Sequence, residues 1–255
     1  MPGIALVTGA SQGIGRAIAC RLAKDGFQVA LNDLPSRQSQ LEGVRAEIEE
    51  IGSQAFLFFA DVSAESQVEQ MINDVVQKMG GLDVLVANAG ICITKPFLET
   101  TREDLAKLLS VNVEGVFFCY KHAALQMIKQ GRGGRIIGAS SIAGKQAWPL
   151  LGAYSTTKFA VRGMTQGAAL ELGKHNITVN AYAPGAVDTD MLHHIRQETA
   201  QNAAKAGTQA PPRRPPLGRE STPEEIAGLV SYLVSKDAAM ITGQCVSING
   251  GMFFD

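Results

Sequence analysis

The sequence predicts an α/β protein built on a doubly wound parallel sheet, with helices on both faces of the sheet. Three observations support this fold class. Short, continuously apolar runs of four to six residues are typical of strands that are buried on both faces. Longer segments with helical periodicity separate these runs. Glycine accounts for 27 of the 255 residues, without the three-residue repeat of collagen, which indicates many tight turns.

Seven apolar runs are expected to form the strands: Ile4–Val7, Gln28–Leu31, Ala55–Ala60, Val84–Ala87, Arg135–Gly138, Thr178–Tyr182 and Val246–Ile248. The segments with helical periodicity between them include Gly13–Asp25, Gln40–Ile51 and Ala64–Met79. Because strand, helix and strand follow one another repeatedly, the crossovers should be right-handed. No domain boundary stands out, so residues 1–255 are expected to form one domain.

One segment departs from this pattern. Residues 200–216 begin with small and polar side chains and end in Pro211-Pro212-Arg213-Arg214-Pro215-Pro216. Such a segment cannot pack as a core element, so it should be mobile or become ordered by a ligand. Two interpretations remain open for it, an active-site lid and a solvated surface loop.

Composition and charge exclude several classes of protein. Hydrophobic residues make up 45% of the chain, which excludes disorder as the main state. With 23 basic and 24 acidic residues, the net charge is -1, so neither nucleic acid nor a membrane is an expected partner. The cysteines lie far apart, and the sequence contains no CxxC or HExxH motif, so no metal site is expected. Without an evident signal peptide or a long apolar run, a soluble, cytoplasmic protein is expected.

A glycine-rich turn directly follows the first predicted strand. The segment Thr8-Gly9-Ala10-Ser11-Gln12-Gly13-Ile14-Gly15 has the spacing G-x3-G-x-G, which differs from both GxGxxG and the Walker motif. Gly9 would let the chain turn out of the strand, Gly13 would let the backbone approach a pyrophosphate, and Gly15 would let the next helix pack closely on the sheet. The N–H groups at the start of that helix would face the anion. The same glycines could instead form only a turn.

Two carboxylates follow the next two strands. Asp33 ends the second strand, where a carboxylate can accept both hydroxyls of an adenosine ribose and would repel a 2′-phosphate. No basic residue follows directly, and Arg37 is four positions further on, so NAD(H) is favoured over NADP(H). Asp33 could instead cap a turn. Asp61, followed by Val62, could accept from an adenine amino group, whereas a helix N-cap at Asp61 or Ser63 is equally compatible.

A phenol and an ammonium are placed four residues apart at Tyr154 and Lys158, so on a helix they would share one side. The ammonium, together with a positive nicotinamide, would lower the pKa of the tyrosine from its reference value near 10. The phenol could then exchange a proton with an alcohol or carbonyl oxygen near neutral pH. Ser141 follows the strand Arg135–Gly138, and its hydroxyl could polarise the substrate oxygen.

Taken together, these motifs resemble the short-chain dehydrogenase/reductase family, in the branch whose chains have this length. The matching segments, in the order of the family, are Thr8-Gly9-x-x-x-Gly13-x-Gly15, Asn88-Ala89-Gly90, Asn112, Ser141, Tyr154-x-x-x-Lys158 and Pro184-Gly185. The resemblance implies a Rossmann-type three-layer sandwich with strand order 3-2-1-4-5-6-7. It also implies an oxidoreductase that transfers a hydride between NAD(H) and a secondary alcohol or ketone.

The same resemblance implies a catalytic Ser-Tyr-Lys-Asn tetrad. Tyr154 would be the general acid in reduction and the base in oxidation, and Lys158 would bind the nicotinamide ribose and tune the tyrosine. Ser141 would orient the carbonyl. Asn112 would hold a water that links Lys158 to solvent, although it could instead be a core residue whose side chain bonds to the backbone.

Further cofactor contacts are implied at two turns. Asn88-Ala89-Gly90 would stabilise the sheet beside the adenosine ribose, with Ala87 in place of the family's frequent first asparagine. The Val187 backbone and the Thr189 hydroxyl would hold the nicotinamide carboxamide, and residues 190–217 would form the substrate lid. The full set of expected cofactor contacts is Gly9, Ser11, Gln12, Gly13, Ile14, Gly15, Asp33, Asp61, Val62, Asn88, Ala89, Gly90, Tyr154, Lys158, Pro184, Gly185, Val187 and Thr189.

Within the family, the sequence looks most like the acetoin/diacetyl reductases, also called 2,3-butanediol dehydrogenases. This resemblance rests on Phe159-Ala160-Val161-Arg162-Gly163, Lys24-Asp25-Gly26-Phe27 and the tail Gly250-Gly251-Met252-Phe253-Phe254. Ile142 and Trp148 depart from it, because relatives that handle small dicarbonyls more often carry polar groups there. Apolar side chains at these positions favour a more hydrophobic ketone or alcohol, cyclic or aromatic, although Trp148 could equally be a core or interface anchor. The expected substrate contacts are Ser141, Ile142, Trp148, Tyr154, Gly185 and Met191.

Two other functions remain open. One is a 3-oxoacyl carrier-protein reductase that uses NADP(H), against which Asp33 and the balanced charge argue. The other is a non-catalytic module that senses NAD(H), against which the intact tetrad argues. The resemblance further implies a homotetramer built on residues 101–130 and 155–175, with Phe253-Phe254 buried at a second interface.

Overall fold

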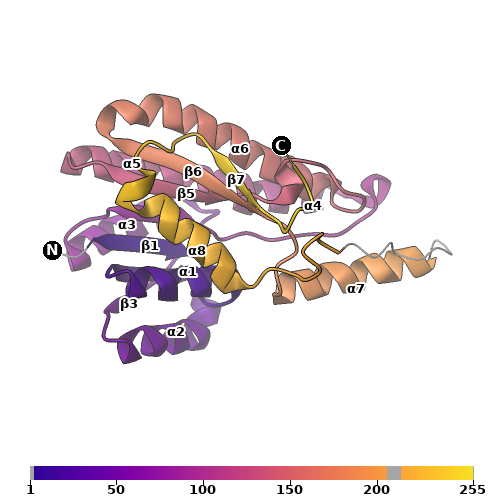
Figure 1. Cartoon of the computed structure of the whole chain (residues 1–255), viewed down its shortest axis with the longest axis horizontal. Helices are drawn as coiled ribbons and strands as arrows, with labels where there is room; N and C mark the ends of the chain where they lie inside the picture. Colours follow the sequence, from indigo (N-terminus) through magenta and orange to yellow (C-terminus); the bar gives the residue numbers. More distant parts are fainter. Residues whose placement is uncertain (1–2, 206–213, 255) are drawn as a thin grey trace.

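A seven-stranded parallel sheet forms the centre of the molecule, as the computed structural model of residues 3–205 and 214–254 shows (Figure 1). The strand order is β3-β2-β1-β4-β5-β6-β7. The predicted fold class and strand order are therefore confirmed. Within the described residues, no helix combines the length and the apolar character that a bilayer crossing requires.

The strands are β1 (Ile4–Thr8), β2 (Gln28–Asp33), β3 (Ala55–Phe59), β4 (Val84–Ala87), β5 (Gly134–Ala139), β6 (Ile177–Pro184) and β7 (Cys245–Ile248). Each differs from its predicted run by at most two residues at either end. The interior strands read as continuous apolar runs because helices cover both faces of the sheet: all five residues of β1 are buried. Leu6 and Val7, which point to opposite faces, belong to two separate core clusters.

The helices are α1 (Gly13–Lys24), α2 (Gln38–Glu50), α3 (Glu65–Met79), α4 (Arg102–Leu109), α5 (Gly115–Gln130), α6 (Gly152–Leu172), α7 (Asp190–Lys205) and α8 (Pro223–Val234). Buried side chains of α3, α5 and α6 pack on one face of the sheet, and those of α1, α2 and α8 pack on the other. In α3, Val68, Met71, Ile72 and Val75 are the buried positions, as the predicted apolar stripe requires.

The irregular segment begins later than the composition indicates. Residues 200–205, predicted to be irregular, continue α7 to Lys205, while residues 206–213 lie outside the described residues. The physical reason is local, because 200–205 contain three alanines and a lysine, which favour a helix. Figure 1 shows α7 beyond the carboxyl ends of the strands. It contains no fully buried residue, but Leu192, Ile195, Thr199 and Asn202 are half-buried at helical spacing along one side.

Parallel strands bring their carboxyl ends to one edge of the sheet. That edge collects the turns after β1, β2, β4, β5 and β6, and so it gathers nearly all of the residues that the motifs had singled out. The strand order reverses between β1 and β4, which is where an open α/β sheet forms a crevice.

Candidate active site

A cleft of 1790 Å³ opens at the carboxyl edge of the sheet. Every residue that the sequence predicted to contact cofactor or substrate lines this cleft. Of the four predicted catalytic residues, Ser141, Tyr154 and Lys158 line it and Asn112 does not.

The glycine turn shapes one wall of the cleft. Gly9 has a φ of 64° and Gly13 a φ of 53°, in the left-handed region that other residues rarely adopt. A Cβ atom on Gly15 would collide with the carbonyl oxygen of Gly9, so the helix can pack this closely only with glycine there. The N-terminus of α1 has no side-chain cap, since Gln12 makes no capping bond, and no acidic residue lies in its first turn. Its backbone N–H groups are therefore available to an anion, which fits the pyrophosphate of a dinucleotide.

Asn88 connects the ends of three strands. Its Nδ2 donates to the carbonyl oxygens of Thr8 (2.9 Å) and Gly9 (3.1 Å), and its Oδ1 accepts from the Tyr182 hydroxyl (2.8 Å). The Thr8 hydroxyl oxygen accepts from the backbone N–H groups of Asn88 and Ala89, both at 3.0 Å. The turn after β4 thus holds the ends of β1 and β6 together, and sequence reasoning had missed the contribution of Tyr182.

Asp33 lines the cleft, and its carboxylate also holds the backbone. Its Oδ2 accepts from the N–H of Ser11 (3.2 Å), and its Oδ1 accepts from the N–H of Leu34 (2.9 Å). Asp33 can therefore cap this turn and still accept hydrogen bonds from ribose hydroxyls, because each carboxylate oxygen retains further acceptor capacity.

Asp61 also lines the cleft, but the alternative helix-cap interpretation is wrong. Asp61 Oδ1 accepts from both the N–H (2.9 Å) and the hydroxyl (2.7 Å) of Ser63, while the N-cap of α3 is Ala64, which makes no side-chain capping bond. The local bond between Asp61 and Ser63 closes a turn before the helix starts, and this turn delays the first helical residue to Glu65.

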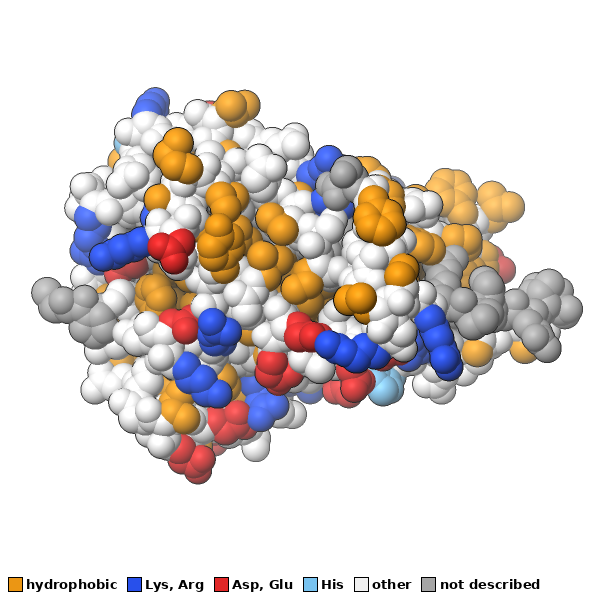
Figure 2. All heavy atoms as spheres, in the orientation of Figure 1, with side chains coloured by type: hydrophobic (Ala, Val, Ile, Leu, Met, Phe, Trp, Pro, Cys, Tyr) orange, Lys and Arg blue, Asp and Glu red, His pale blue; other side chains and the backbone are white. Residues whose placement is uncertain are grey.

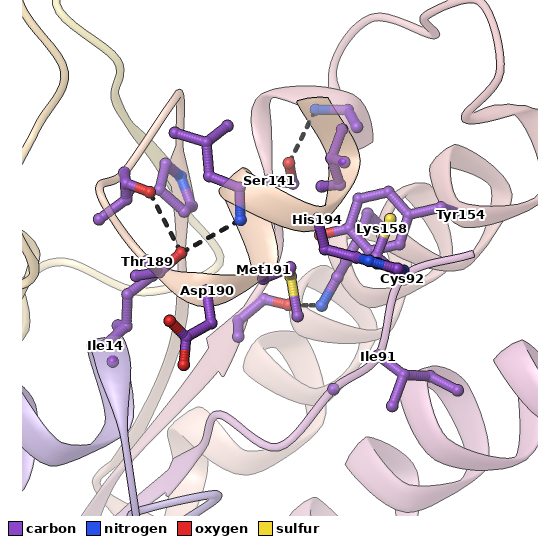
Figure 3. A pocket seen from close by; sticks show the side chains of 18 of the residues that line it. Ile14, Ile91, Cys92, Ser141, Tyr154, Lys158, Thr189, Asp190, Met191 and His194 are labelled. Carbon is purple, nitrogen blue, oxygen red and sulfur yellow. Dashed lines mark hydrogen bonds between the residues drawn. The ribbon is translucent and has the colours of Figure 1, made fainter. Parts of the chain in front are cut away.

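Tyr154, Lys158 and Ser141 lie together in the cleft (Figure 3). The Lys158 Nζ donates to the carbonyl oxygen of Ala139 (2.8 Å) and lies 5.6 Å from the centroid of the Tyr154 ring. The Ser141 hydroxyl oxygen accepts from the N–H of Ala143 (3.0 Å), and the Ser141 side chain is hydrogen-bonded to the Tyr154 phenol. All three side chains are buried, with exposures of 8% or less.

The pKa of Tyr154 is raised in the protein by itself. Burial raises it above its ordinary value, and the hydrogen bond with Ser141 offsets only part of this rise. Burial also lowers the pKa of Lys158 to about 8, so the charged form of its amine is less strongly favoured in the site than in water. In the protein by itself, loss of solvent therefore outweighs one ammonium. The prediction that Lys158 and a positive nicotinamide together lower the pKa of Tyr154 stays a prediction.

Asn112 lies behind the cleft, within a π-helical turn (Ser110–Glu114) that joins α4 to α5. Its side chain is fully buried: Oδ1 accepts from the N–H of Ile91 (2.9 Å), and Nδ2 donates to the Ile91 carbonyl (2.9 Å) and to the Thr157 hydroxyl (3.1 Å). These bonds fix the loop after β4 against α6, where Tyr154 and Lys158 lie. This arrangement matches the alternative of a core asparagine bonded to the backbone.

Apolar side chains surround Tyr154. Trp148 and Leu151 pack with Tyr154 in one cluster, which Ile91 and Cys92 also join. Trp148 packs in this cluster and also lines the cleft, so the interpretation as a core anchor and the interpretation as a substrate contact are compatible. Cys92 was not singled out by the sequence, although it follows the Asn88-Ala89-Gly90 turn by two residues, and burial raises the pKa of its thiol to about 11. Ile142 and Met191 complete the apolar lining.

The turn after β6 leads into α7. The Thr189 hydroxyl donates to the Val187 carbonyl oxygen (3.1 Å) and accepts from the N–H of Leu192 (3.4 Å), so it stabilises the start of the helix. A Cβ atom on Gly185 would lie 2.9 Å from Cβ of Asn249, which explains glycine at this position. This turn borders the cleft between Tyr154 and α7 (Figure 3).

Known proteins resemble this chain over nearly its whole length. A family model described as enoyl-(acyl carrier protein) reductase matches residues 9–253. A short-chain dehydrogenase/reductase of Armillaria gallica is 53% identical over 253 residues, which are 99% of this chain and 96% of the relative. An L-2,3-butanediol dehydrogenase of Corynebacterium glutamicum is 45% identical over 258 residues and all of both chains. A 3-oxoacyl-[acyl-carrier-protein] reductase of Staphylococcus aureus is 40% identical over 98% of this chain and 97% of its own.

Solved structures agree with these relatives. A short-chain type dehydrogenase/reductase from Mycobacterium marinum superposes with a TM-score of 0.89 at 35% identity, covering 98% of this chain and 95% of that one. A short chain dehydrogenase from Burkholderia cenocepacia, in complex with NADP, gives a TM-score of 0.86 at 34% identity and covers 98% and 97% of the two chains. With the cleft, the glycine turn and the Ser141–Tyr154–Lys158 arrangement, these similarities show that the chain belongs to the short-chain dehydrogenase/reductase family and is an NAD(P)-dependent oxidoreductase.

Proposed function

We propose that the protein interconverts a hydrophobic secondary alcohol and the corresponding ketone, with NAD(H) as its preferred cofactor. The observation that carries this proposal is the arrangement of Tyr154, hydrogen-bonded to Ser141, next to Lys158 and packed among apolar side chains of the same cleft. Such a cleft gives a proton-transfer group to the substrate oxygen and apolar surface to its substituents.

In the proposed reaction, the Tyr154 hydroxyl gives a proton to the carbonyl oxygen during reduction and takes one back from the alcohol during oxidation. The Ser141 hydroxyl donates to the same oxygen and holds it within reach of the phenol. Lys158 binds ribose hydroxyls and supplies a positive charge that favours the phenolate. When bound, the nicotinamide supplies or accepts the hydride. Asn112 acts behind the cleft and fixes the loop against α6.

The cofactor is proposed to bind along the carboxyl edge of the sheet. The first turn of α1 would hold the pyrophosphate, Asp33 the adenosine ribose, and Val187 with Thr189 the nicotinamide carboxamide. Asp33 supports NAD(H). Arg37 also lines the cleft, where its guanidinium could pair with the 2′-phosphate of NADP(H). Steady-state rates with NADH and NADPH test this preference, and Asp33→Ser should move it toward NADPH.

The substrate is proposed to be a hydrophobic or cyclic secondary alcohol, or an acetoin- or diacetyl-type ketone. The 45% identical L-2,3-butanediol dehydrogenase supports the latter, and the apolar lining from Ile142, Trp148, Met191 and Leu151 supports the former.

Residues 190–217 are proposed as a lid, since α7 packs on the cleft by one half-buried side only.

The test follows absorbance of NADH while the protein is incubated with a panel of ketones, for the native chain and for Tyr154→Phe. Turnover that falls by about 10²–10⁴-fold in the variant is expected, because the proton donor is lost. Binding of NADH without turnover of any ketone or alcohol would instead support a module that only senses NAD(H).

A second candidate is a 3-oxoacyl carrier-protein reductase using NADP(H). The 40% identical relative from Staphylococcus aureus favours it. A 3-oxoacyl thioester offered with NADPH discriminates between the two, since a carrier-protein reductase should prefer this pair over a cyclic ketone with NADH.

A homotetramer is proposed as the assembly. Phe117 and Leu125 on α5, and Phe159 and Leu170 on α6, are exposed apolar side chains on the two helices expected at one interface. Figure 2 shows further apolar side chains gathered over the region of α8 and β7, and Phe254 is 83% exposed in the single chain. Light scattering tests this, and a monomer would refute it. Among the described residues, no cysteine pairs in a disulfide, which fits the proposed cytoplasmic location.

A further inference from the structure

Leu150 has a backbone conformation that a leucine rarely adopts. Its φ is 67°, in the left-handed region where a Cβ atom raises the energy and glycine is the usual residue. Among the described residues other than glycine, Asn176 alone shares a positive φ, and asparagine tolerates that region well. The backbone of Leu150 is therefore strained in a way that a glycine would not be.

The strain arises in a turn that leads into α6. The N–H of Leu151 donates to the carbonyl oxygen of Trp148 (3.1 Å), which closes a turn with Pro149 second. Proline holds φ negative at that position, so the positive φ of the third residue, Leu150, is typical of a type II turn. The Leu150 carbonyl oxygen also accepts from the N–H of Lys95 (2.9 Å), in the loop after β4. Both bonds use backbone atoms only, so a glycine at position 150 would keep them.

The side chain of Leu150 does not contribute to the hydrophobic core. The described residues form three hydrophobic clusters, and Leu150 belongs to none of them, either as a buried member or as a residue packed against one. Instead, its side chain is half-buried and lines the cleft. Strained residues of this kind are typical of ligand sites, where the strain is retained because of the contact that the side chain provides.

The turn lies next to the residue that is proposed to transfer the proton. Trp148 and Leu151, the two ends of the turn, pack in the same cluster as Tyr154. For a ketone whose oxygen reaches the Tyr154 hydroxyl, this turn is therefore part of the wall around the substituents. The side chain that Leu150 adds to this wall is wholly apolar, so it stabilises an apolar substituent and offers no hydrogen bond to a polar one.

We propose that Leu150 determines substrate preference by packing against an apolar substituent of the ketone, so that ketones with long apolar substituents are preferred over short ones. The strained turn is tolerated because it places this side chain in the cleft. The inference deepens the proposed function and rests on it, since it requires a ketone bound with its oxygen at Tyr154. It favours the hydrophobic ketone over the acetoin- or diacetyl-type ketone, the two classes that the proposed function leaves open.

The experiment measures kcat and KM for two series of ketones, 2-butanone to 2-octanone and cyclohexanone to 4-butylcyclohexanone, with saturating NADH and the full-length chain. In the native protein, kcat/KM should rise along at least one series, by about fourfold for each methylene group that becomes buried. In Leu150→Gly, the longest ketone of that series should lose about 10- to 100-fold in kcat/KM, and the shortest less than about twofold. The loss should lie in KM, because the contact is away from the reacting carbon. Leu150→Met, which keeps an apolar side chain of similar volume, should retain most of the preference.

Thermal unfolding separates this role from a structural one. Leu150→Gly should lower the midpoint by less than about 4 °C or raise it, because relief of the strain offsets the greater freedom of glycine in the unfolded chain. Asn176→Gly is the matched backbone control: it replaces the other residue of positive φ, which does not line the cleft, and should leave the ketone preference unchanged.

Equal kcat/KM along both series in the native protein would overturn the inference, as would equal losses for the shortest and longest ketones in Leu150→Gly. Faster turnover of the longest ketones in that variant would also overturn it, because Leu150 would then limit the size of the substrate rather than bind it. A midpoint lowered by more than about 4 °C would show that the side chain serves the fold. In each of these cases, turnover of any ketone leaves the proposed function standing. Absence of turnover with every ketone and both cofactors would refute the proposed function itself.

Discussion

The ammonium of Lys158 donates a 2.8 Å hydrogen bond to the carbonyl oxygen of Ala139, the last residue of β5. This bond fixes the ammonium between the end of the sheet and the Tyr154 ring, where its side chain is almost fully buried. Burial lowers the pKa of Lys158 to about 8, so the ammonium proposed to serve the chemistry lowers the stability of the fold.

Lys158→Met should therefore separate stability from activity. Methionine fills a similar volume without a charge, so the free energy of unfolding at pH 7 should stay equal or rise by about 1–3 kcal/mol. Turnover of any accepted ketone should fall at least about 100-fold, since the charge beside Tyr154 is gone. Urea unfolding and steady-state rates measure the two effects. A large loss of stability would show that the bond to Ala139 outweighs the desolvation cost.

The stability difference between Lys158→Met and the native chain should depend on pH. Between about pH 8, the pKa of folded Lys158, and 10.5, its ordinary value, the unfolded chain binds more protons at this residue than the folded chain. The contribution of Lys158 to the free energy of unfolding thus becomes less unfavourable as pH rises through this window, and it is constant below pH 8. The advantage of the variant should be largest below pH 8 and vanish toward pH 10.5. Urea titrations at several pH values test it, and a difference that grows with pH would contradict the assignment.

Ser141→Ala should shift the pH profile of alcohol oxidation to higher pH. The hydrogen bond with Ser141 lowers the pKa of Tyr154, which burial otherwise raises, so its removal raises that pKa further. Oxidation needs the deprotonated phenol, so its rate should rise only at a more alkaline pH than in the native protein. Profiles of kcat/KM for the alcohol at saturating NAD⁺ measure the shift. An acid-side shift would mean that Tyr154 is not the titrating base.

Asn88 and Tyr182 should be energetically coupled. Asn88→Ala removes the side-chain bonds to Thr8, Gly9 and Tyr182 and should lower the free energy of unfolding by about 2–4 kcal/mol. Tyr182→Phe removes one bond and should cost about 1 kcal/mol. In a double-mutant cycle, the combined loss should be smaller than the sum, because both changes remove the same 2.8 Å bond. Strict additivity would argue that the bond contributes nothing.

Gly15→Ala should damage both the fold and dinucleotide binding. The added methyl group would collide with the Gly9 carbonyl, and the turn that presents the N-terminus of α1 would have to move. Gly43→Ala in the exposed part of α2 is the matched control, because nothing lies within 4 Å of its added Cβ. That variant should gain up to about 1 kcal/mol from helix propensity and bind NADH normally. Intrinsic fluorescence titration with NADH, beside thermal unfolding, distinguishes the two variants.

Much of this molecule follows from local sequence pattern. The apolar runs located all seven strands within two residues, and the spacing of Tyr154 and Lys158 placed both on one side of α6. The glycine turn predicted a phosphate site directly after the first strand, and this turn lines the cleft. These features are determined by the sequence because they depend on the period of the backbone and on glycine's freedom at φ values near 60°.

Other properties were decided only by packing. The direction of the Tyr154 pKa depends on how completely its neighbours exclude water, and no spacing in the sequence reports that. The bond between Asn88 and Tyr182 joins residues 94 positions apart, and the burial of Asn112 behind the cleft depends on the π-turn that joins α4 to α5. Desolvation and long-range contacts are properties of the assembled structure, because they arise from what surrounds a residue and not from the residues that adjoin it in the chain.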